Sequence, residues 1–346
     1  MRSIYRNLAP LALAALAACG GGDGRQVLTI YSPHGREMLQ AFEKKYEAAH
    51  PNVDVQFLDM GSQEVLDRLR SERANPQADV WWGAPAPTFE EAARDSLLEA
   101  FTPTWAGALP AEAKSARGLW YGTYLTPEVI AFNSTAVPAA QAPKDWDEVL
   151  DPKWKGKVLI RDPMASGTMR AIFGMVMQRS LRATGDTAQG WQWLRRLDAQ
   201  TKEYTVDPTT LYLKVARQEG LVTLWDMPDI EAQRSRAQAP LPLDYVFPTS
   251  GTPVIVDCVA IVKGTKNAQL AREFAEWVGG PGVIPAAREF FRLPARTDIP
   301  ADSLPPRLAA VKAQIKTEPL DWAQLQEQTP GWMRYWDEHV RGSSKR

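Results

Sequence analysis

The residues of this sequence best suited to bind a ligand are Ser166, Gly167 and Thr168, which follow a short apolar stretch. Residues 158–160 predict a buried strand, and apolar residues at helical spacing after Thr168 predict a helix that begins at this tripeptide. The first amides of a helix have no partner within it, and the helix dipole makes this end partially positive. Two hydroxyl groups and a bare glycine at such an end therefore suit an anion. The alternative is an ordinary helix that Ser166 merely caps.

Three units of strand, short loop and helix follow one another between residues 27 and 98. This order predicts a parallel sheet with helices on its faces, and the ligands of such sheets bind at the carboxyl ends of the strands. The third helix should begin at the capping box formed by Thr88 and Glu91. The loops 32–35, 61–62 and 83–85 should share one rim. The candidate ligand-binding residues on this rim are Ser32, His34, Gly35, Ser62, Trp82 and Gly83.

Two of these rim residues have plain structural alternatives. Side chains alternate in direction along a strand, so one of Trp81 and Trp82 belongs to the core, and we assign Trp82 to the rim. His34 could equally cap its own helix or face solvent.

A second series of strands and helices begins near residue 120 and supplies further candidates. Residues 221–225 predict a strand that ends in Trp225 and is followed by Asp226. Asp226 could accept protons from hydroxyl or ammonium groups of a ligand, and Trp225 could form a flat apolar wall. Asp226 could instead only cap the helix after it. Thr252, just before the apolar strand 254–262, could contact the ligand or lie at a hinge.

The composition limits the class of protein. The 346 residues are 45% hydrophobic and 23% charged, which is typical of globular proteins, and the length suits two lobes. The chain has 40 basic and 41 acidic side chains, so no basic surplus indicates a nucleic-acid partner. Cys258 lies in an apolar strand pattern, and we expect it to be a small buried side chain that forms no disulfide.

The N-terminal residues predict export. Two arginines precede an uncharged run of eleven residues, 8–18, which is too short to span a bilayer and is typical of a secretory signal. The sequence Leu-Ala-Ala-Cys that ends at Cys19 resembles a bacterial lipobox. It implies a signal peptide over residues 1–18, a lipid on Cys19 and a tether over residues 19–25, and thus a periplasmic lipoprotein anchored in a membrane. The alternative is an ordinary signal peptide cleaved near Ala18.

Several short motifs occur along the chain in a characteristic order. They are 31–34 (YSPH), 78–83 (ADVWWG), 151–157 (DPKWKGK), 166–168 (SGT), 251–254 (GTPV) and 262–267 (VKGTKN). Together they resemble the family 1 extracellular solute-binding proteins of bacterial ABC importers, and most closely the branch for ferric iron, sugar phosphates and aminoethylphosphonate. The resemblance extends over residues 27–340.

The resemblance implies an α/β fold with two lobes, the type II periplasmic binding protein fold, and a ligand cleft between the lobes. The first lobe would comprise residues 26–122 and 251–280, and the second lobe residues 123–250 and 281–346. It also implies a monomer whose lobes close around a small-molecule anion, with an ABC permease and ATPase in the inner membrane as partners.

The sequence distinguishes among the ligands of that branch. The resemblance implies adjacent tyrosines in iron-binding members at the place where this chain has Leu224-Trp225-Asp226-Met227, and this sequence contains no pair of adjacent tyrosines. Ferric iron prefers phenolate and carboxylate oxygens, so direct iron binding is disfavoured, whereas a ferric chelate stays open. We therefore expect no metal and no cofactor. The predicted ligand is a small organic anion, either a phosphorylated sugar or a phosphonate.

Enzymes and sensors are the rival classes. The sequence lacks the common nucleophile and zinc motifs and has only three histidines, which disfavours an enzyme. A lipoprotein that senses a ligand for a membrane receptor would have the same two lobes, so the importer component and the sensor both remain open.

Overall fold

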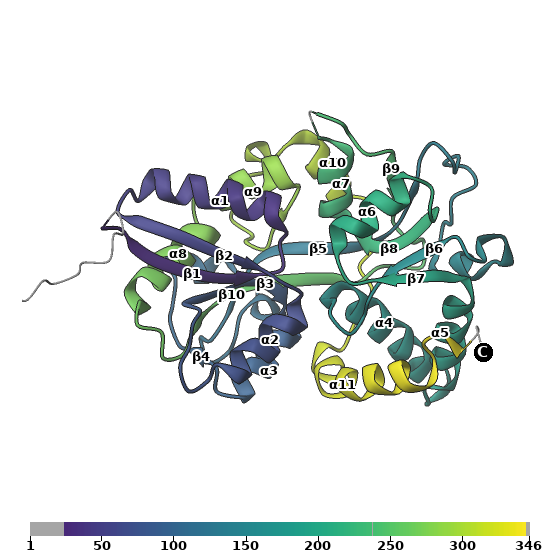
Figure 1. Ribbon diagram of the computed structural model, residues 1–346, viewed down its shortest axis with the longest axis horizontal. Helices are drawn as coiled ribbons and strands as arrows, with labels where there is room; N and C mark the ends of the chain where they lie inside the picture. The colour runs from purple at the N-terminus through teal and green to yellow at the C-terminus, as the bar shows by residue number, and fades with distance from the viewer. Residues whose placement is uncertain (1–23, 237, 344–346) are drawn as a thin grey trace, which may run out of the picture.

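The computed structural model describes residues 24–236 and 238–343. The predicted signal peptide, 1–18, and the predicted lipid-bearing Cys19 lie outside the described residues. Within the described ranges, no helix is both long enough and apolar enough to pass through a bilayer. The chain forms two lobes that lie side by side and are joined by long strands (Figure 1).

In the first lobe, β2 (Val53–Asp59), β1 (Gln26–Ser32), β3 (Val80–Pro85) and β10 (Val254–Val262) lie side by side in this order. β1 pairs in parallel with β2 and β3, which confirms the predicted parallel arrangement, and β10 pairs antiparallel with β3. Helices α1 (Arg36–Ala49) and α8 (Ala268–Gly279) pack on one face, and α2 (Ser62–Ser71) and α3 (Ala86–Arg94) pack on the other. The sheet of this lobe is therefore covered on both faces.

A long strand, β5 (Tyr121–Asn133), joins the two lobes (Figure 1). Its first half, up to Pro127, pairs with β10, and its second half, from Glu128, pairs with β8 (Val222–Asp226) and β9 (Leu243–Val246). β6 (Val158–Arg161) and β7 (Thr201–Thr205) complete the sheet of the second lobe. β5 thus places Pro127 and Glu128 at the junction between the lobes.

The second lobe also has helices on both faces of its strands. α4 (Gly167–Thr184), α5 (Ala188–Gln200) and α11 (Trp322–His339) contribute to one core, and α6 (Pro208–Ala216), α7 (Met227–Arg234) and α10 (Pro306–Lys312) contribute to the other. α4 begins where the sequence predicted, because the Ser166 hydroxyl accepts a hydrogen bond from the Met169 amide (3.2 Å).

The segment between α8 and α10 lies at the junction and is attached mainly to the first lobe, whereas the predicted division gave residues 281–346 to the second. β11 (Leu293–Pro294) pairs with the first half of β5, and the amide of Thr297 donates to the carbonyl oxygen of Ala108. α9 (Val283–Phe290) contributes Ala286 to the core of the first lobe, whereas Ala287 of α9 and Leu293 of β11 pack in a core of the second. The chain therefore passes to the second lobe for the last time after Thr297, about 17 residues later than the predicted boundary at residue 280.

Local details complete the comparison with the predicted elements. α3 begins at Ala86, not at Thr88, because Pro87 in its first turn already has the backbone angle of a helix. The Cys258 thiol is buried, as predicted, and it is free among the described residues. The remaining short elements are β4 (Leu98–Glu99) and the 3-10 turns η1 (Thr104–Ala108), η2 (Ala111–Ala113), η3 (Trp146–Leu150), η4 (Pro152–Trp154) and η5 (Ala301–Ser303).

Candidate functional site

A cavity of about 730 Å³ lies between the two lobes. Its walls are formed by the loops after β1 and β2 of the first lobe and after β6, β7 and β8 of the second. Each of these loops leads into a helix, so the N termini of α1, α2, α4, α6 and α7 surround the cavity. Because helix N termini are partially positive, this arrangement favours an anionic ligand.

Eight of the predicted binding residues line this cavity. They are His34, Gly35, Ser62, Ser166, Gly167, Thr168, Trp225 and Asp226. They come from loops of both lobes that follow the carboxyl ends of strands, which is where open α/β sheets bind their ligands.

The other four predicted residues do not line the cavity. Ser32 is fully buried, and its hydroxyl oxygen lies 3.0 Å from Nδ1 of His34. Trp82 is fully buried as well, and its ring packs against His34 in the core of the first lobe, since helices cover both faces of β3. A Cβ atom on Gly83 would lie 2.4 Å from the His34 ring, so the glycine leaves room for that ring. The Thr252 hydroxyl donates to the carbonyl oxygen of Glu128 (2.6 Å) at the junction between the lobes.

The first turn of α4 faces the cavity with unused hydrogen-bond donors. Within the described residues, no hydrogen bond uses the backbone amides of Gly167 and Thr168, as expected at a helix start. Ser62 of the first lobe lies close by, because a Cβ atom on Gly167 would be 3.1 Å from its hydroxyl oxygen. One acceptor group in the cavity could therefore meet amides and hydroxyl groups from both lobes.

Arg161, the last residue of β6, is a binding candidate that sequence reasoning missed. Its side chain lines the cavity and is only 5% exposed, and its Nε and Nη1 have no hydrogen-bond partner among the described residues. Burial lowers the pKa of this guanidinium. A buried charge with unused donors is costly unless another group satisfies it, and an anion in the cavity would do so. The only signal in the sequence is a charged residue directly after the apolar run 158–160.

Arg292 is a second buried arginine that lines the cavity and that sequence reasoning missed. Its Nη2 donates to Oδ1 of Asp229 (2.5 Å). Burial lowers the pKa of Arg292, but the carboxylates of Asp229, Asp226 and Asp257 outweigh burial and raise it. We call Arg292, Asp226, Asp229 and Asp257 the Arg292 cluster. Because β11 pairs with the part of β5 that lies in the first lobe and α7 belongs to the second lobe, the ion pair between Arg292 and Asp229 links the lobes.

Asp226 caps a helix and lines the cavity at the same time. Its Oδ1 accepts a hydrogen bond from the Asp229 amide (2.9 Å), which caps α7. Burial raises the pKa of Asp226 well above its usual value, the Asp229 carboxylate adds to this rise, and Arg292 opposes it. Asp226 can therefore cap α7 and contact a ligand at the same time.

Two further carboxyl groups at the junction between the lobes are fully or almost fully buried. Burial raises the pKa of Glu128 well above its usual value, and neither of its oxygens has a hydrogen-bond partner among the described residues. Burial also raises the pKa of Asp257, against the opposing charge of Arg292. These carboxyl groups keep their protons to higher pH than in water, so this region carries less negative charge than its composition suggests.

His34 lines the cavity as a neutral ring. Burial lowers the pKa of His34 well below its usual value, and the charge of Arg292 lowers it further. The ring packs between Trp82 and Tyr124, with centroid distances of 4.5 and 5.9 Å. Its Nε2 has no hydrogen-bond partner among the described residues. His34 can therefore offer a ligand one hydrogen bond but no charge.

The two lobes touch each other beside the cavity. Arg236 of the second lobe forms an ion pair with Glu37 of the first. A Cβ atom added to Gly61 would lie 2.7 Å from the carbonyl oxygen of Ala165, and one added to Gly167 would lie 2.7 Å from Cδ of Pro85. Glycine at these two positions allows the lobes to approach this closely.

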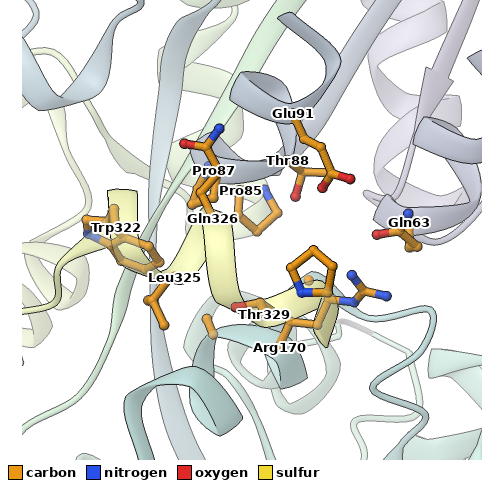
Figure 2. Close-up of a pocket in the computed structure, with 13 residues that line it drawn as sticks. Gln63, Pro85, Pro87, Thr88, Glu91, Arg170, Trp322, Leu325, Gln326 and Thr329 are labelled. Carbon is orange, nitrogen blue, oxygen red and sulfur yellow. The ribbon is translucent and has the colours of Figure 1, made fainter. Parts of the chain in front are cut away.

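A much smaller hollow, of about 50 Å³, is lined by α3, α4 and α11 (Figure 2). It lies next to the contact between the lobes. Trp322 and Leu325 of α11 and Pro87 of α3 line it. Arg170, also in its wall, donates to the backbone carbonyls of Pro163 and Met164 and thus has a structural role. The hollow has room for little more than water, so the larger cavity is the candidate ligand site.

The described residues contain no group of three His, Cys, Asp or Glu side chains placed to hold a metal ion. Tyr212 lines the cavity, but its hydroxyl donates to Oδ2 of Asp229 (2.8 Å). Burial raises the pKa of Tyr212 well above its usual value, and Asp229 adds to this rise. A phenol in this setting resists ionisation and is a poor ligand for ferric iron.

Comparisons with known proteins agree with this architecture. Residues 38–317 match the family described as bacterial extracellular solute-binding protein. The probable ABC transporter periplasmic-binding protein y4fP of Sinorhizobium fredii is 29% identical over 326 residues, which are 91% of this chain and 86% of that protein. A putative 2-aminoethylphosphonate-binding periplasmic protein of Salmonella typhimurium is 30% identical over 204 residues, which are 56% of this chain and 55% of that protein.

Solved structures share the fold. The periplasmic binding protein AfuA from Actinobacillus pleuropneumoniae, with exogenous fructose 6-phosphate bound, has a TM-score of 0.79 and 23% identity, and the match covers 92% of this chain and 99% of that one. Ferric ion-binding proteins are among the other solved structures of this fold.

Proposed function

This chain belongs to the bacterial extracellular solute-binding protein family, and we propose that it captures a small organic anion for an ABC importer. A phosphate or phosphonate group of the ligand would lie at the first turn of α4, beside Arg161, and the rest of the ligand would occupy the cavity between the lobes. The closed lobes would then dock on a membrane permease that an ATPase drives. Contacts made only when both lobes hold the ligand would favour the closed form.

One observation carries this proposal: a helix N terminus with unused amides shares a cavity with a buried arginine whose donors are unused. Each hydrogen bond to a charged group contributes about 1.5–3 kcal/mol. A few such bonds give roughly micromolar affinity after the cost of association. Gly167, Thr168 and Arg161 line the same cavity, which supports their proposed role as donors to such a group.

The ligands of named relatives support the same chemical class. One relative is named for 2-aminoethylphosphonate, and a protein of the same fold holds fructose 6-phosphate. Both compounds carry a tetrahedral phosphorus group with several charged oxygens. Amides, hydroxyl groups and guanidinium groups are the donors that bind such oxygens in proteins.

Direct binding of ferric iron is the alternative, since iron-binding proteins also have this fold. The contacts around Asp229 argue against it. This carboxylate already accepts hydrogen bonds from Arg292, Tyr212 and Trp225, so its oxygens are engaged. A ferric chelate would still bind through the anionic groups of its chelator. A sensor for a membrane receptor would bind the same anion, and a permease encoded nearby would favour the importer.

The protein is further proposed to be a periplasmic lipoprotein attached to a membrane through Cys19. The lipobox-like sequence before Cys19 supports this, and relatives with periplasmic names agree with export.

A panel of phosphorus compounds tests the proposed function. Fructose 6-phosphate, glucose 6-phosphate, 2-aminoethylphosphonate and ethylphosphonate are compared with ferric citrate by melting temperature and calorimetry. At least one phosphorus compound should raise the melting temperature through linkage, and more than ferric citrate does. Arg161→Gln should weaken the binding of that compound by at least about tenfold, since it removes charge-assisted hydrogen bonds.

The matched control is Arg334→Gln, which changes an exposed arginine on α11 of the same lobe, outside the cavity. The control should bind like the wild type. A wild-type melting temperature that no phosphorus compound changes refutes the proposed function. Wild-type affinity in a folded Arg161→Gln variant refutes the placement of the anion.

A further inference from the structure

We propose that Arg292 and Asp226 form a second subsite that recognises a hydroxyl group of the ligand, so that the ligand is a phosphorylated polyol, the class to which sugar phosphates belong. This inference rests on the proposed function, because it describes the part of the ligand that extends from the anionic group. It selects one of the two ligand classes left open above.

The donor of this subsite is Arg292. It is only 5% exposed and lines the cavity, and its one side-chain hydrogen bond to the described residues runs from Nη2 to Asp229. Its Nε has no hydrogen-bond partner among the described residues. A guanidinium carries five N–H groups, so most of its donor capacity is unused. Phe291, which precedes it, has a left-handed φ of 54° and ends α9, so the turn that delivers Arg292 to the cavity is itself unusual.

The acceptor of this subsite is Asp226. It is only 4% exposed and lines the cavity, and its Oδ1 is used to cap α7. No hydrogen bond within the described residues uses its Oδ2. Asp229 connects the two members of the subsite, because its amide donates to Asp226 and its carboxylate accepts from Arg292. Arg292, with its unused donors, and Asp226, with its unused acceptor, are therefore both hydrogen-bonded to Asp229.

The other carboxylates of the Arg292 cluster are already engaged. Asp229 accepts hydrogen bonds from Arg292, Tyr212 and Trp225. Asp257 accepts one from the Ala84 amide (3.3 Å) and one from the Thr126 hydroxyl. Neither is available as a free counter-charge for a cation on the ligand. The subsite thus presents one acceptor and a fixed positive charge.

A hydroxyl group matches this pair better than an ammonium group does. A hydroxyl both donates and accepts, so it can donate to Asp226 and accept from Arg292. An ammonium group only donates, would leave the Arg292 donors unused, and would place a second positive charge beside the guanidinium. A plain alkyl group would leave both partners unsatisfied in a buried site. We therefore expect the protein to bind polyol phosphates most tightly, and aminoalkyl and alkyl phosphonates much more weakly.

Three kinds of compound that share a phosphorus-containing anionic group test this order of affinities with the full mature protein. Fructose 6-phosphate, glucose 6-phosphate and glycerol 3-phosphate carry hydroxyl groups, 2-aminoethylphosphonate carries an ammonium group, and ethylphosphonate carries neither. By calorimetry, at least one polyol phosphate should bind tenfold or more tightly than both phosphonates. If 2-aminoethylphosphonate or ethylphosphonate binds as tightly, the hydroxyl subsite is overturned while the proposed function stands. If none of the five compounds binds, the proposed function fails and this inference fails with it.

Asp226→Asn tests the residue itself. Asparagine caps helices about as well as aspartate, so the fold should be kept. When the asparagine oxygen caps α7, its NH2 group faces the cavity and adds a donor beside Arg292, so the acceptor is lost. Affinity for the best polyol phosphate should fall at least tenfold, while the melting-temperature shift with saturating ethylphosphonate stays unchanged. An equal loss for both ligands, or no loss for either, overturns the role of Asp226.

The matched control is Asp321→Asn, which makes the same change at the N-cap of α11, outside the cavity. It should bind all compounds like the wild type. If Asp226→Asn does not fold, Arg292→Lys is a second variant that tests the same subsite. Lysine keeps the charge but lacks the planar donor array, so polyol phosphate affinity should again fall by tenfold or more. Unchanged affinity in Arg292→Lys overturns the proposal.

Discussion

Gly167→Ala is the substitution that most directly tests whether ligand binding depends on contact between the lobes. Gly167 is the first residue of α4 in the second lobe, and Pro85 ends β3 in the first. A Cβ atom on Gly167 would lie 2.7 Å from Cδ and 2.8 Å from Cγ of Pro85. Ordinary contact begins at 3.4 Å, and the proline ring is held in place at a helix start. The lobes would have to separate by more than half an ångström at this point.

The free-energy cost of the added methyl group in Gly167→Ala can be taken from other overpacked contacts. An extra methyl group in a close-packed contact typically costs about 1–3 kcal/mol. Here the strain exists only when the lobes touch, so the protein can relieve it by opening, and the cost falls on the closed form. A loss of about 1–3 kcal/mol from closure corresponds to roughly 5- to 150-fold weaker ligand binding. Stability without ligand should change little, since alanine is accepted at the first position of a helix.

Calorimetry with the tightest phosphorus compound, together with the melting temperature of the ligand-free protein, measures both parts of this expectation. Gly331→Ala in α11 is the matched control, because a Cβ atom there meets nothing within 4 Å. The control should bind like the wild type and melt slightly higher, since alanine favours the helix. If Gly167→Ala binds as tightly as the wild type, the lobes do not need this contact to hold the ligand. If it melts well below the wild type, the strain lies within a lobe instead of between lobes.

Two further predictions concern pH and membrane attachment. Because burial raises the pKa of Glu128, the folded protein holds a proton there that the unfolded chain releases near pH 4.3. The free energy of unfolding therefore falls as pH rises from that value toward the pKa of the folded state. Glu128→Gln should therefore melt higher than the wild type at pH 8 by a few degrees and lose this advantage at pH 4, whereas a difference independent of pH would contradict the buried proton. Cys19→Ser should move the expressed protein from the membrane fraction to the periplasmic fraction, and its retention in the membrane fraction would falsify lipid anchoring.

Features that depend on neighbours in the sequence could be predicted. The helix that carries Met38, Leu39, Phe42 and Tyr46 buries these four residues, because their spacing alone defines its apolar face. Ser166 caps α4 for a similarly local reason, since its hydroxyl bonds an amide three residues later. The convergence of loops on one rim also followed from the order of strands and helices, which fixes where parallel strands end.

Features that depend on distant residues were missed. Trp81 and Trp82 are both buried, because α1 and α8 cover one face of β3 and α2 and α3 cover the other, so alternation along the strand could not place either residue at the cavity. Arg292 meets Asp229 across 63 residues of sequence, and only the return of β11 to the first lobe brings it to the cavity. No local pattern predicts such a meeting.

The Arg292 cluster explains how an acidic cavity can still select an anion. Three carboxyl groups near the junction would attract a metal ion or an ammonium group if they stood alone. Here a guanidinium lies among them, pairs with Asp229 and acts on Asp226 and Asp257, so the cluster already contains its own cation. The cation comes from the first lobe and its nearest carboxylate from the second, so lobe contact and charge balance are achieved by the same ion pair. A ligand that enters such a site need not neutralise the carboxyl groups. It must instead satisfy the unused donors of Arg161 and Arg292, and that requirement is met by an anion whose remaining atoms can accept hydrogen bonds.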